Sequence, residues 1–437
     1  MSIKGKITEK IPERRDRMNF LRKEYGDFKV SEVTVDQIYG GIRGVQISVS
    51  DISYVDPQEG IRLRGYSIPE VLKLLPKPKD SAFPYSGGLY YLLMTDELPT
   101  LEDALEVEQE WKIRRKVPNH VYDVLNAMPI STHPMTLFSQ AIMAMQTDSV
   151  FAKHYSSIMP KTTYWEYFLE DSLNLTARLP EIAAYIYNRK CRAGQYIPPN
   201  PDLDWSANFA HMIGMGDNKE YTELSRLYFV LHADHEGANV SAHASSLVGS
   251  ALSDIYMCSA AGMNGLAGPL HGLANQECLQ WLLKTLDHFN GELPDDEQLS
   301  KYLRLLLNSG HTIPGYGHAV LRIPDPRFTA LYQFAESNLP DDVNFKLVKQ
   351  VYRVLPGILT EMGKVKNPWP NVDAIGGAIQ YHYGVKEFDF YTVLFGVSRI
   401  LGLSAHAVWA RAQMKPIERP KSLTMKMLED MVGINHS

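Results

Sequence analysis

Cysteine is scarce in this 437-residue sequence, which contains only Cys191, Cys258 and Cys278 and no Cys-x-x-Cys pair. An odd and sparse set of thiols does not make a disulfide framework, so the sequence predicts a reducing compartment. Apolar residues also never form an unbroken run of about 18, the length that a membrane span requires. We therefore expect no association with a membrane.

Neither sign of charge dominates the sequence. Charged residues make up 22% of the chain and the formal net charge is -6, whereas nucleic-acid-binding domains usually carry a strongly basic surface. We therefore expect no nucleic-acid partner. The length favours a large core that is divided into more than one domain.

The N-terminal segment MSIKGKITEKIPERRDRMNF lacks the apolar core of a secretory signal and includes Glu9 and Glu13. Acidic residues are uncommon in mitochondrial transit peptides. We therefore expect a bacterial cytoplasmic protein. The alternative is a mitochondrial matrix protein from which a transit peptide has been removed.

Helical patterns cover most of the sequence. The segment TLEDALEVEQEWKI at 100–113 places Thr100 as an N-cap three residues before Asp103 and repeats apolar residues at helical spacing. Pro134 suits the first turn of a helix, and Gly310 suits the end of one. Further helices are predicted at residues 121–128, 162–178, 180–189, 221–233, 275–289, 295–309, 344–355 and 392–412.

A different pattern lies between Gly44 and Gly65, where apolar and polar residues alternate at 45–49 and again at 61–63. Alternation with a period of two favours β-strands, and the intervening segment VDPQEG has the composition of a turn. The sequence therefore predicts a mainly α protein with one minor β-hairpin.

Several common catalytic motifs are absent. The sequence has no Gly-Lys-Ser/Thr phosphate loop, no Gly-x-Ser-x-Gly and no His-Glu-x-x-His, and Gly315-Tyr316-Gly317 lacks the third glycine of a dinucleotide fingerprint. These absences exclude the commonest classes of nucleotide-binding protein and hydrolase. The remaining candidates are histidines.

One histidine cluster lies in LHADHEGANVSAH, which places His232, His235, Glu236 and His243 close together. The spacing allows a metal site. It equally allows one histidine to bind a ligand carboxylate while the others pack in the core, or all of them to be structural.

Two further histidines lie in glycine-rich segments, His271 in GPLHG and His318 in GYGHA. Glycine neighbours let a ligand approach the backbone closely, so two such loops in one chain favour a binding or catalytic role. Asp373 follows two prolines in KNPWPNVDA, where partial burial would make the carboxylate a stronger base. A cap on the following segment is the structural alternative for Asp373.

Six segments together carry a resemblance. GPLHGLANQE, IPGYGHAVLR, DPR, NPWPNVDA, FGVSR and ERPKS occur in this order. They resemble the signature segments of the citrate synthase family, in its long eukaryote-type branch. YGGIRG at 39–44, DPQEGIRLRGYSIPE at 56–70 and DHEGANVSAH at 234–243 agree as well, so the likeness extends from about Ile11 to Ser422.

The resemblance implies three catalytic residues. Asp373 would remove a methyl proton from acetyl-CoA while a neutral His271 donates a hydrogen bond to the thioester oxygen. His318 would polarise the ketone of oxaloacetate, and the citryl thioester would then be hydrolysed to citrate and CoA. The chemistry needs an ionised but poorly solvated carboxylate beside a neutral imidazole.

The resemblance also assigns the substrate contacts. His235, Arg327, Arg399 and Arg419 would bind the carboxylates of oxaloacetate, with Arg419 reaching across from a partner subunit so that the homodimer is obligatory. Guanidinium groups suit this role because they grip a carboxylate with two hydrogen bonds.

Arg43, Lys161 and Arg322 would contact CoA. Lys161 stands where the animal enzymes are expected to have arginine. Three further departures lie near the ligands: Ala238 for a glycine, His311 for an arginine, and Ile375-Gly376-Gly377 for His-Ser-Gly. They leave the expected reaction unchanged and bear on selectivity among acyl-CoA substrates.

The implied fold has a large helical domain, residues 1–271 and 382–437, and a smaller helical domain, residues 272–381, which closes over the substrates. No metal and no cofactor is expected, because acetyl-CoA is a substrate. The alternatives are a 2-methylcitrate synthase that uses propionyl-CoA, which Trp369 disfavours, a non-catalytic structural relative, and a metal-dependent hydrolase built on the His232–His243 cluster.

Overall fold

A computed structural model describes residues 2–156, 158–318, 320–363 and 365–434 of the chain. The described residues are mainly helical, as the sequence predicts. Their one sheet is small and antiparallel, with the strand order β1 (Ser53–Asp56), β2 (Gly60–Leu63), β3 (Tyr66–Ser67).

The predicted hairpin is present, but its first strand begins later than the alternation at 45–49 indicates. Ser53 pairs with Leu63 and Val55 with Ile61. The backbone nitrogens of Gln58 and Glu59 in the connecting turn both donate to Asp56 Oδ1. The strand prediction at 45–49 is wrong because alternation also occurs in an extended segment that has no partner strand.

Eight of the predicted helices are confirmed, with small shifts at their ends, except that the helix predicted at 344–355 runs seven residues past its predicted end and through Pro356. Thr100 and Asp103 form the capping box that begins the first of them, as predicted. They are α5 (Leu101–Arg114), α6 (Asn119–Ala127), α7 (Pro134–Ala144), α11 (Lys219–Leu231), α14 (Ala274–His288), α15 (Asp296–Asn308), α17 (Val343–Met362) and α19 (Tyr391–Ala412).

The predicted break before Pro180 is wrong, because α9 (Tyr164–Cys191) runs through it. Proline has no N–H to donate to the carbonyl four residues earlier, which would leave Thr176 O without its helical partner. The indole Nε1 of Trp205 donates to Thr176 O at 2.9 Å instead. A tertiary contact therefore replaces the hydrogen bond that proline removes.

The remaining helices were not predicted as separate elements. They are α1 (Ile3–Tyr25), α2 (Val35–Tyr39), α3 (Ile68–Leu74), α4 (Ser86–Thr95), α8 (Val150–His154), α10 (Trp205–Ala210), α12 (Val240–Ser250), α13 (Ile255–Leu266), α16 (Pro326–Asn338), α18 (Asp373–His382) and α20 (Met425–Val432). Four short turns of helix are η1 (Met145–Asp148), η2 (Lys161–Thr163), η3 (His211–Met215) and η4 (Phe388–Phe390).

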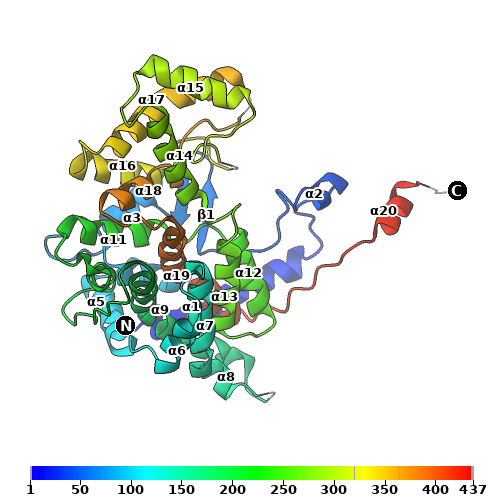
Figure 1. Cartoon of the computed structure of the whole chain (residues 1–437). Coiled ribbons are helices and arrows are strands. Elements are labelled where there is room, and N and C mark those ends of the chain that lie inside the picture. Colours follow the sequence, from blue (N-terminus) through cyan, green and yellow to red (C-terminus); the bar gives the residue numbers. More distant parts are fainter. Residues whose placement is uncertain (1, 157, 319, 364, 435–437) are drawn as a thin grey trace.

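Helix α19 is the centre of the larger part of the molecule, where it packs against α4, α9, α11, α12 and α13. The segment Phe388–Ala412 is long and apolar enough to cross a membrane by length and composition, but 94% of its most apolar window is buried in the protein. That burial is what a core helix shows. Figure 1 shows α14 to α18 gathered at the opposite end of the molecule. The division at residues 272 and 381 remains a prediction.

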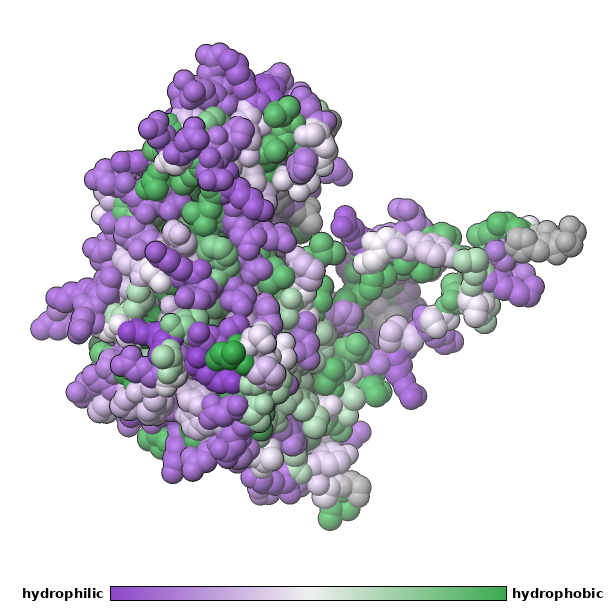
Figure 2. Space-filling view, in the orientation of Figure 1, coloured by the Kyte–Doolittle hydropathy of each residue, from purple (hydrophilic) through white to green (hydrophobic). Residues whose placement is uncertain are grey.

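Two segments extend away from this body, as Figure 1 shows. We call residues 26–50, which include α2, the N-terminal arm, and residues 413–434, which end in α20, the C-terminal arm. Both carry exposed apolar side chains, visible in Figure 2. Among them are Phe28 (72% exposed), Val49 (79%), Met425 (67%) and Met431 (71%). Such exposure in two adjacent segments is typical of a surface that another chain covers.

Candidate active site

Side chains from five parts of the fold converge where the two ends of the molecule meet. His235 lies between α11 and α12, and His271 follows α13. His318 lies in the loop before α16, Asp373 is the first residue of α18, and Arg399 lies in α19. These residues are far apart in the sequence. The fold brings them together closely enough that the charge of Arg399 influences the pKa values of both His271 and Asp373.

Hydrogen bonds fix the His271 imidazole in one tautomer. The backbone N–H of Ser241 donates to His271 Nε2 at 3.3 Å, and Ser241 Oγ lies 3.1 Å from the same nitrogen. The Ser241 hydroxyl itself donates to Asn239 Oδ1. Because Nε2 accepts, the proton of the neutral ring is on Nδ1. Burial, helped by the nearby Arg399, lowers the pKa of His271 to about 4, so the ring is neutral at pH 7.

The His318 imidazole has the opposite tautomer. The backbone N–H groups of Val320 and Leu321 both donate to His318 Nδ1, at 3.0 and 3.1 Å. Nε2 therefore carries the proton. Burial and the neighbouring Arg327 lower the pKa of His318 below its ordinary value. The ring is thus a neutral donor through Nε2.

The loop that carries His318 is fastened to the start of α18. Asn371 N donates to Gly315 O at 2.8 Å, and Gly317 N donates to Trp369 O at 3.1 Å. Gly315 has φ +81°, and a Cβ on it would lie 2.7 Å from Ala374 Cα. Only glycine fits this position. The close approach holds His318 and Asp373 in a fixed relation.

Asp373 has the environment of a base. Its backbone N–H donates to Asn371 Oδ1 at 3.0 Å. Burial raises the pKa of the carboxyl to about 6, and the charges of Arg327 and Arg399 partly oppose that rise. The carboxylate therefore remains mostly ionised at pH 7 while being more basic than an ordinary aspartate.

Arg399 is a buried cation, only 1% exposed. Its Nε donates to His232 O, and its Nη1 lies 3.3 Å from Ser241 Oγ. Burial lowers the pKa of Arg399 to about 10. No carboxylate among the described residues forms a salt bridge with Arg399. A buried guanidinium without such a partner is suited to an anionic ligand.

Arg327 is also buried, but it has a partner. Its Nη2 lies 2.7 Å from Asp325 Oδ2, and Nε lies 3.1 Å from Asp325 Oδ1. Burial by itself lowers the pKa of Arg327, but Asp325 raises it above its ordinary value. Asp325 thus fixes the guanidinium at the first turn of α16.

His235 completes the cluster, with its ring centroid 5.6 Å from that of His318. Burial lowers its pKa well below the ordinary value, and the charges of Arg327 and Arg399 act in the same direction. His235 is therefore neutral and can donate a hydrogen bond to a carboxylate.

The other predicted residues lie elsewhere in the single chain. Arg43 and Arg419 are exposed in the N-terminal and C-terminal arms, and Lys161 is exposed at the start of η2. Arg322 lies on the His318 loop, where its backbone N–H donates to Pro57 O at 2.8 Å.

The His232–His243 cluster does not form a metal-binding group. His232 is fully buried, with its ring stacked 4.0 Å from that of Tyr228. His243 lies 3.4 Å from Glu418. Among the described residues there is no group of three or more His, Cys, Asp and Glu side chains that could hold a metal ion.

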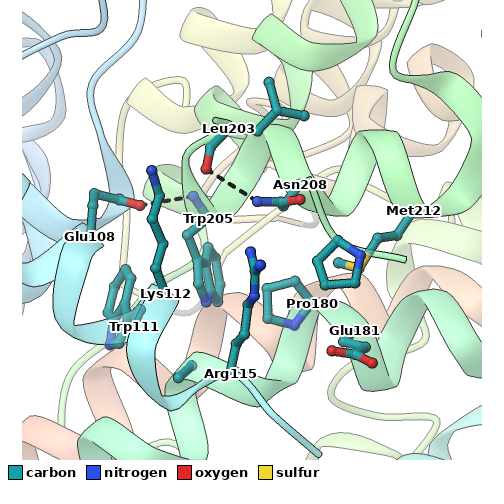
Figure 3. Close-up of a pocket in the computed structure, with 12 residues that line it drawn as sticks. Glu108, Trp111, Lys112, Arg115, Pro180, Glu181, Leu203, Trp205, Asn208 and Met212 are labelled. Atoms are coloured by element: carbon teal, nitrogen blue, oxygen red, sulfur yellow. Dashed lines mark hydrogen bonds between the residues drawn. The ribbon is translucent and has the colours of Figure 1, made fainter. Parts of the chain in front are cut away.

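A separate pocket between α5, α9 and α10 contains none of the candidate residues. Its cavity volume is only about 30 Å³, and Figure 3 shows it lined by Trp111, Arg115 and Trp205. Glu108 at its edge accepts hydrogen bonds from the backbone nitrogens of Gly87 and Trp205. These bonds join α4, α5 and α10, so the role of Glu108 is structural.

Three residues that support the site were not singled out from the sequence: Asn239, Ser241 and Asp325. Asn239 and Asp325 are N-caps of α12 and α16, a signal that the sequence offers. Of the departures, Ala238 and His311 are exposed and Ile375 is fully buried.

The chain is similar to proteins of one family over nearly its whole length. The family model described as citrate synthase, C-terminal domain, matches residues 41–421. A protein of Glossina morsitans morsitans named "Probable citrate synthase, mitochondrial" is 52% identical, with 99% of this chain and 92% of the relative covered. A mitochondrial citrate synthase of Daucus carota is 49% identical, with 98% and 91% covered.

Solved structures agree. A citrate synthase from Pyrobaculum aerophilum has a TM-score of 0.75 at 25% identity and covers 88% of this chain and 92% of its own. The Thermoplasma acidophilum enzyme, solved with carboxymethyl coenzyme A and oxaloacetate, has a TM-score of 0.74 at 20% identity and covers 90% and 97%. With the motifs and the fold, these matches show that the chain belongs to the citrate synthase family.

Proposed function

We propose that this site condenses acetyl-CoA with oxaloacetate and hydrolyses the resulting thioester to citrate and CoA. The observations that carry the proposal are a neutral His271 whose Nε2 accepts from Ser241 N and a poorly solvated Asp373, two groups whose pKa values are both influenced by Arg399. One group donates a hydrogen bond and the other accepts a proton, as enolisation of a thioester requires.

In the first step, Asp373 takes a proton from the methyl group of acetyl-CoA. Negative charge moves onto the thioester oxygen, where the Nδ1–H of His271 donates a hydrogen bond. Because this donor is held in place before the reaction, it stabilises the enolate without reorganisation. The raised pKa of Asp373, about 6, brings its basicity closer to what the transfer requires.

In the second step, the enolate carbon attacks the ketone carbon of oxaloacetate. The ketone oxygen develops alkoxide charge and takes the Nε2 proton of His318 to become a hydroxyl; His318 regains a proton, and Asp373 loses the one it took, before the next cycle. His235, Arg327 and Arg399 hold the two carboxylates of oxaloacetate. Water then attacks the thioester carbonyl, the bond from carbon to sulfur breaks, and CoA leaves as the thiol. We propose that no metal and no cofactor takes part, because the two imidazoles supply the polarising donors.

We propose further that the working unit is a homodimer in which Arg419 enters the partner's site. Support comes from the exposure of Arg419 on the C-terminal arm and from the uncovered apolar residues of both arms. The N-terminal arm would place Arg43, and η2 of the second copy would place Lys161, at a CoA site to which Arg322 also belongs. Domain closure over the substrates would exclude water during enolisation.

A mixed dimer tests the shared site. Arg419→Ala and Asp373→Ala chains, each poorly active alone, are co-expressed with different tags, and the mixed dimer is purified. If Arg419 serves the partner, one of the two sites in the mixed dimer is intact and activity returns. If Arg419 serves its own chain, both sites are damaged and activity stays low.

The relatives from Glossina morsitans morsitans and Daucus carota are named as mitochondrial proteins, so we propose a mitochondrial location. The expectation of a bacterial cytoplasm finds no support in these comparisons. Fractionation of cells that contain the native protein, with matrix and cytosolic markers, tests this location.

The reaction itself is tested by following CoA release with a thiol reagent, using oxaloacetate with acetyl-CoA and, separately, with propionyl-CoA. A much higher kcat/KM for acetyl-CoA, lost in Asp373→Ala, supports the proposal. A preference for propionyl-CoA would make 2-methylcitrate the product. If neither thioester reacts, the structural alternative is favoured.

A further inference from the structure

A buried polar network surrounds Asp234, the residue before His235 in the sequence. Asp234 is 1% exposed, and its Oδ2 accepts hydrogen bonds from Ser53 Oγ at 2.6 Å and from His406 Nε2 at 2.9 Å. His406 Nδ1 lies 3.0 Å from Ser50 Oγ. Asp234 and His406 therefore join α19, the segment before β1 and the loop that carries His235.

Helix α19 faces this loop with residues at helical spacing. Arg399 donates to His232 O, and Gly402 N donates to Ala233 O at 3.1 Å. A Cβ on Gly402 would lie 2.5 Å from Ala233 O and 2.6 Å from Asp234 Oδ1. His406 is one turn further along. The same helix therefore supplies Arg399 and holds the backbone carbonyls of the two residues before Asp234.

The loop has an unfavourable backbone conformation directly after His235. Glu236 has φ +55°, which non-glycine residues rarely adopt. Its N–H donates to Ser53 Oγ at 2.7 Å, and Ser53 in turn donates to Asp234. Asn239 Nδ2 donates to the carbonyl oxygens of His235 and Glu236, both at 2.7 Å. Conformations of this kind persist when surrounding contacts impose them.

We propose that Asp234 and His406 are positioning residues that hold the His235 ring in the geometry that binds oxaloacetate. The pair acts through Ser53 and the backbone of residues 233–236 and touches neither substrate. This inference rests on the proposed role of His235 in binding oxaloacetate. Assays of wild-type enzyme and His235→Ala test that role first, so failure there is separate from failure of the positioning role.

The decisive measurement compares the KM for oxaloacetate with the KM for acetyl-CoA in the same variant. We expect His406→Ala to raise the KM for oxaloacetate on the order of 10-fold, because a displaced binding group weakens contacts without touching the chemistry. The KM for acetyl-CoA, measured at saturating oxaloacetate, should change much less. His406→Gln keeps an N–H that can reach Asp234, so it should recover part of the lost affinity.

A matched control is available in a second histidine–aspartate pair. His382, the last residue of α18, has its Nδ1 2.8 Å from Oδ2 of Asp342, the N-cap of α17. Both residues lie outside the loop that carries His235. His382→Ala removes a pair of the same chemistry from a more exposed position, where the His382 side chain is 35% exposed, and should leave the KM for oxaloacetate unchanged. An equal effect of both variants would overturn the proposal, as would equal changes for both substrates without rescue by glutamine.

Because His406→Ala leaves a buried carboxylate without its partner, it can fail to fold. Ser53→Ala is the milder variant: it removes only the hydroxyl that links Asp234 to Glu236 N. We expect a folded protein with a raised KM for oxaloacetate and a nearly unchanged KM for acetyl-CoA. Binding of oxaloacetate at the wild-type level by Ser53→Ala would refute the positioning role.

Discussion

The loops of His271 and His318 reach similar chemistry by opposite routes. In the first, a backbone N–H binds Nε2 and leaves the proton on Nδ1. In the second, two backbone N–H groups bind Nδ1 and leave the proton on Nε2. Both rings are neutral because burial and nearby arginines lower their pKa values. The backbone, more than the neighbouring side chains, decides which nitrogen donates to a ligand.

The largest effect is expected from removing the proposed base, Asp373. Asp373→Asn keeps the shape of the side chain but cannot take a proton, so kcat should fall about 1,000-fold. CoA release under saturating substrates measures the loss. A variant with more than a tenth of wild-type activity would show that another group is the base.

Substitutions of His271 and His318 should have different effects when proton removal from acetyl-CoA is measured apart from the overall reaction. Each of His271→Ala and His318→Ala should lower kcat about 100-fold, because each removes one preorganised donor. Only His271→Ala should slow exchange of the acetyl-CoA methyl hydrogens with D₂O, measured with a four-carbon dicarboxylate that lacks a ketone. Equal slowing of exchange in both variants would contradict the assignment.

The pH dependence distinguishes Asp373 from the imidazoles. Its pKa is about 6, so protonation removes the base as pH falls below 6, and kcat/KM should drop about tenfold per pH unit. His271 has a pKa of about 4 and stays neutral over this range. A pH profile of kcat/KM for acetyl-CoA, with enzyme stability checked at each pH, should show one acidic limb near 6. A flat profile down to pH 5 would exclude this base.

The smallest effect on kcat is expected from Ser241→Ala, which tests whether the backbone N–H fixes the His271 tautomer. Ser241→Ala removes the hydroxyl beside His271 Nε2 but keeps the N–H that donates to it. We expect kcat to fall less than about threefold, because what is lost is mainly the hydrogen bond that the hydroxyl donates to Asn239, while the backbone N–H still fixes the tautomer. A loss as large as that of His271→Ala would mean that the hydroxyl, not the backbone, fixes the tautomer.

The helical character of the protein depends on local signals and was predicted correctly from the sequence, whereas the roles of the site residues that the motifs single out stay predictions. Helical spacing and the Thr100 cap give α5, and the ordered glycine-rich motifs give His271, His318 and Asp373. Local signals failed at Pro180, where Trp205 supplies the missing partner, and at 45–49, where no strand pairs with the alternating residues. In both places a contact between distant residues decides the outcome.

The sequence by itself determined which side chains are available for the site: imidazoles, a carboxylate and guanidinium groups, all in recognisable motifs. Only the tertiary structure decided their ionisation and their tautomers. Burial raises the pKa of Asp373 and lowers those of the histidines, and backbone N–H groups from residues 241, 320 and 321 select the donor nitrogens. Desolvation and hydrogen-bond direction depend on neighbours in space, which a linear pattern of residues does not contain.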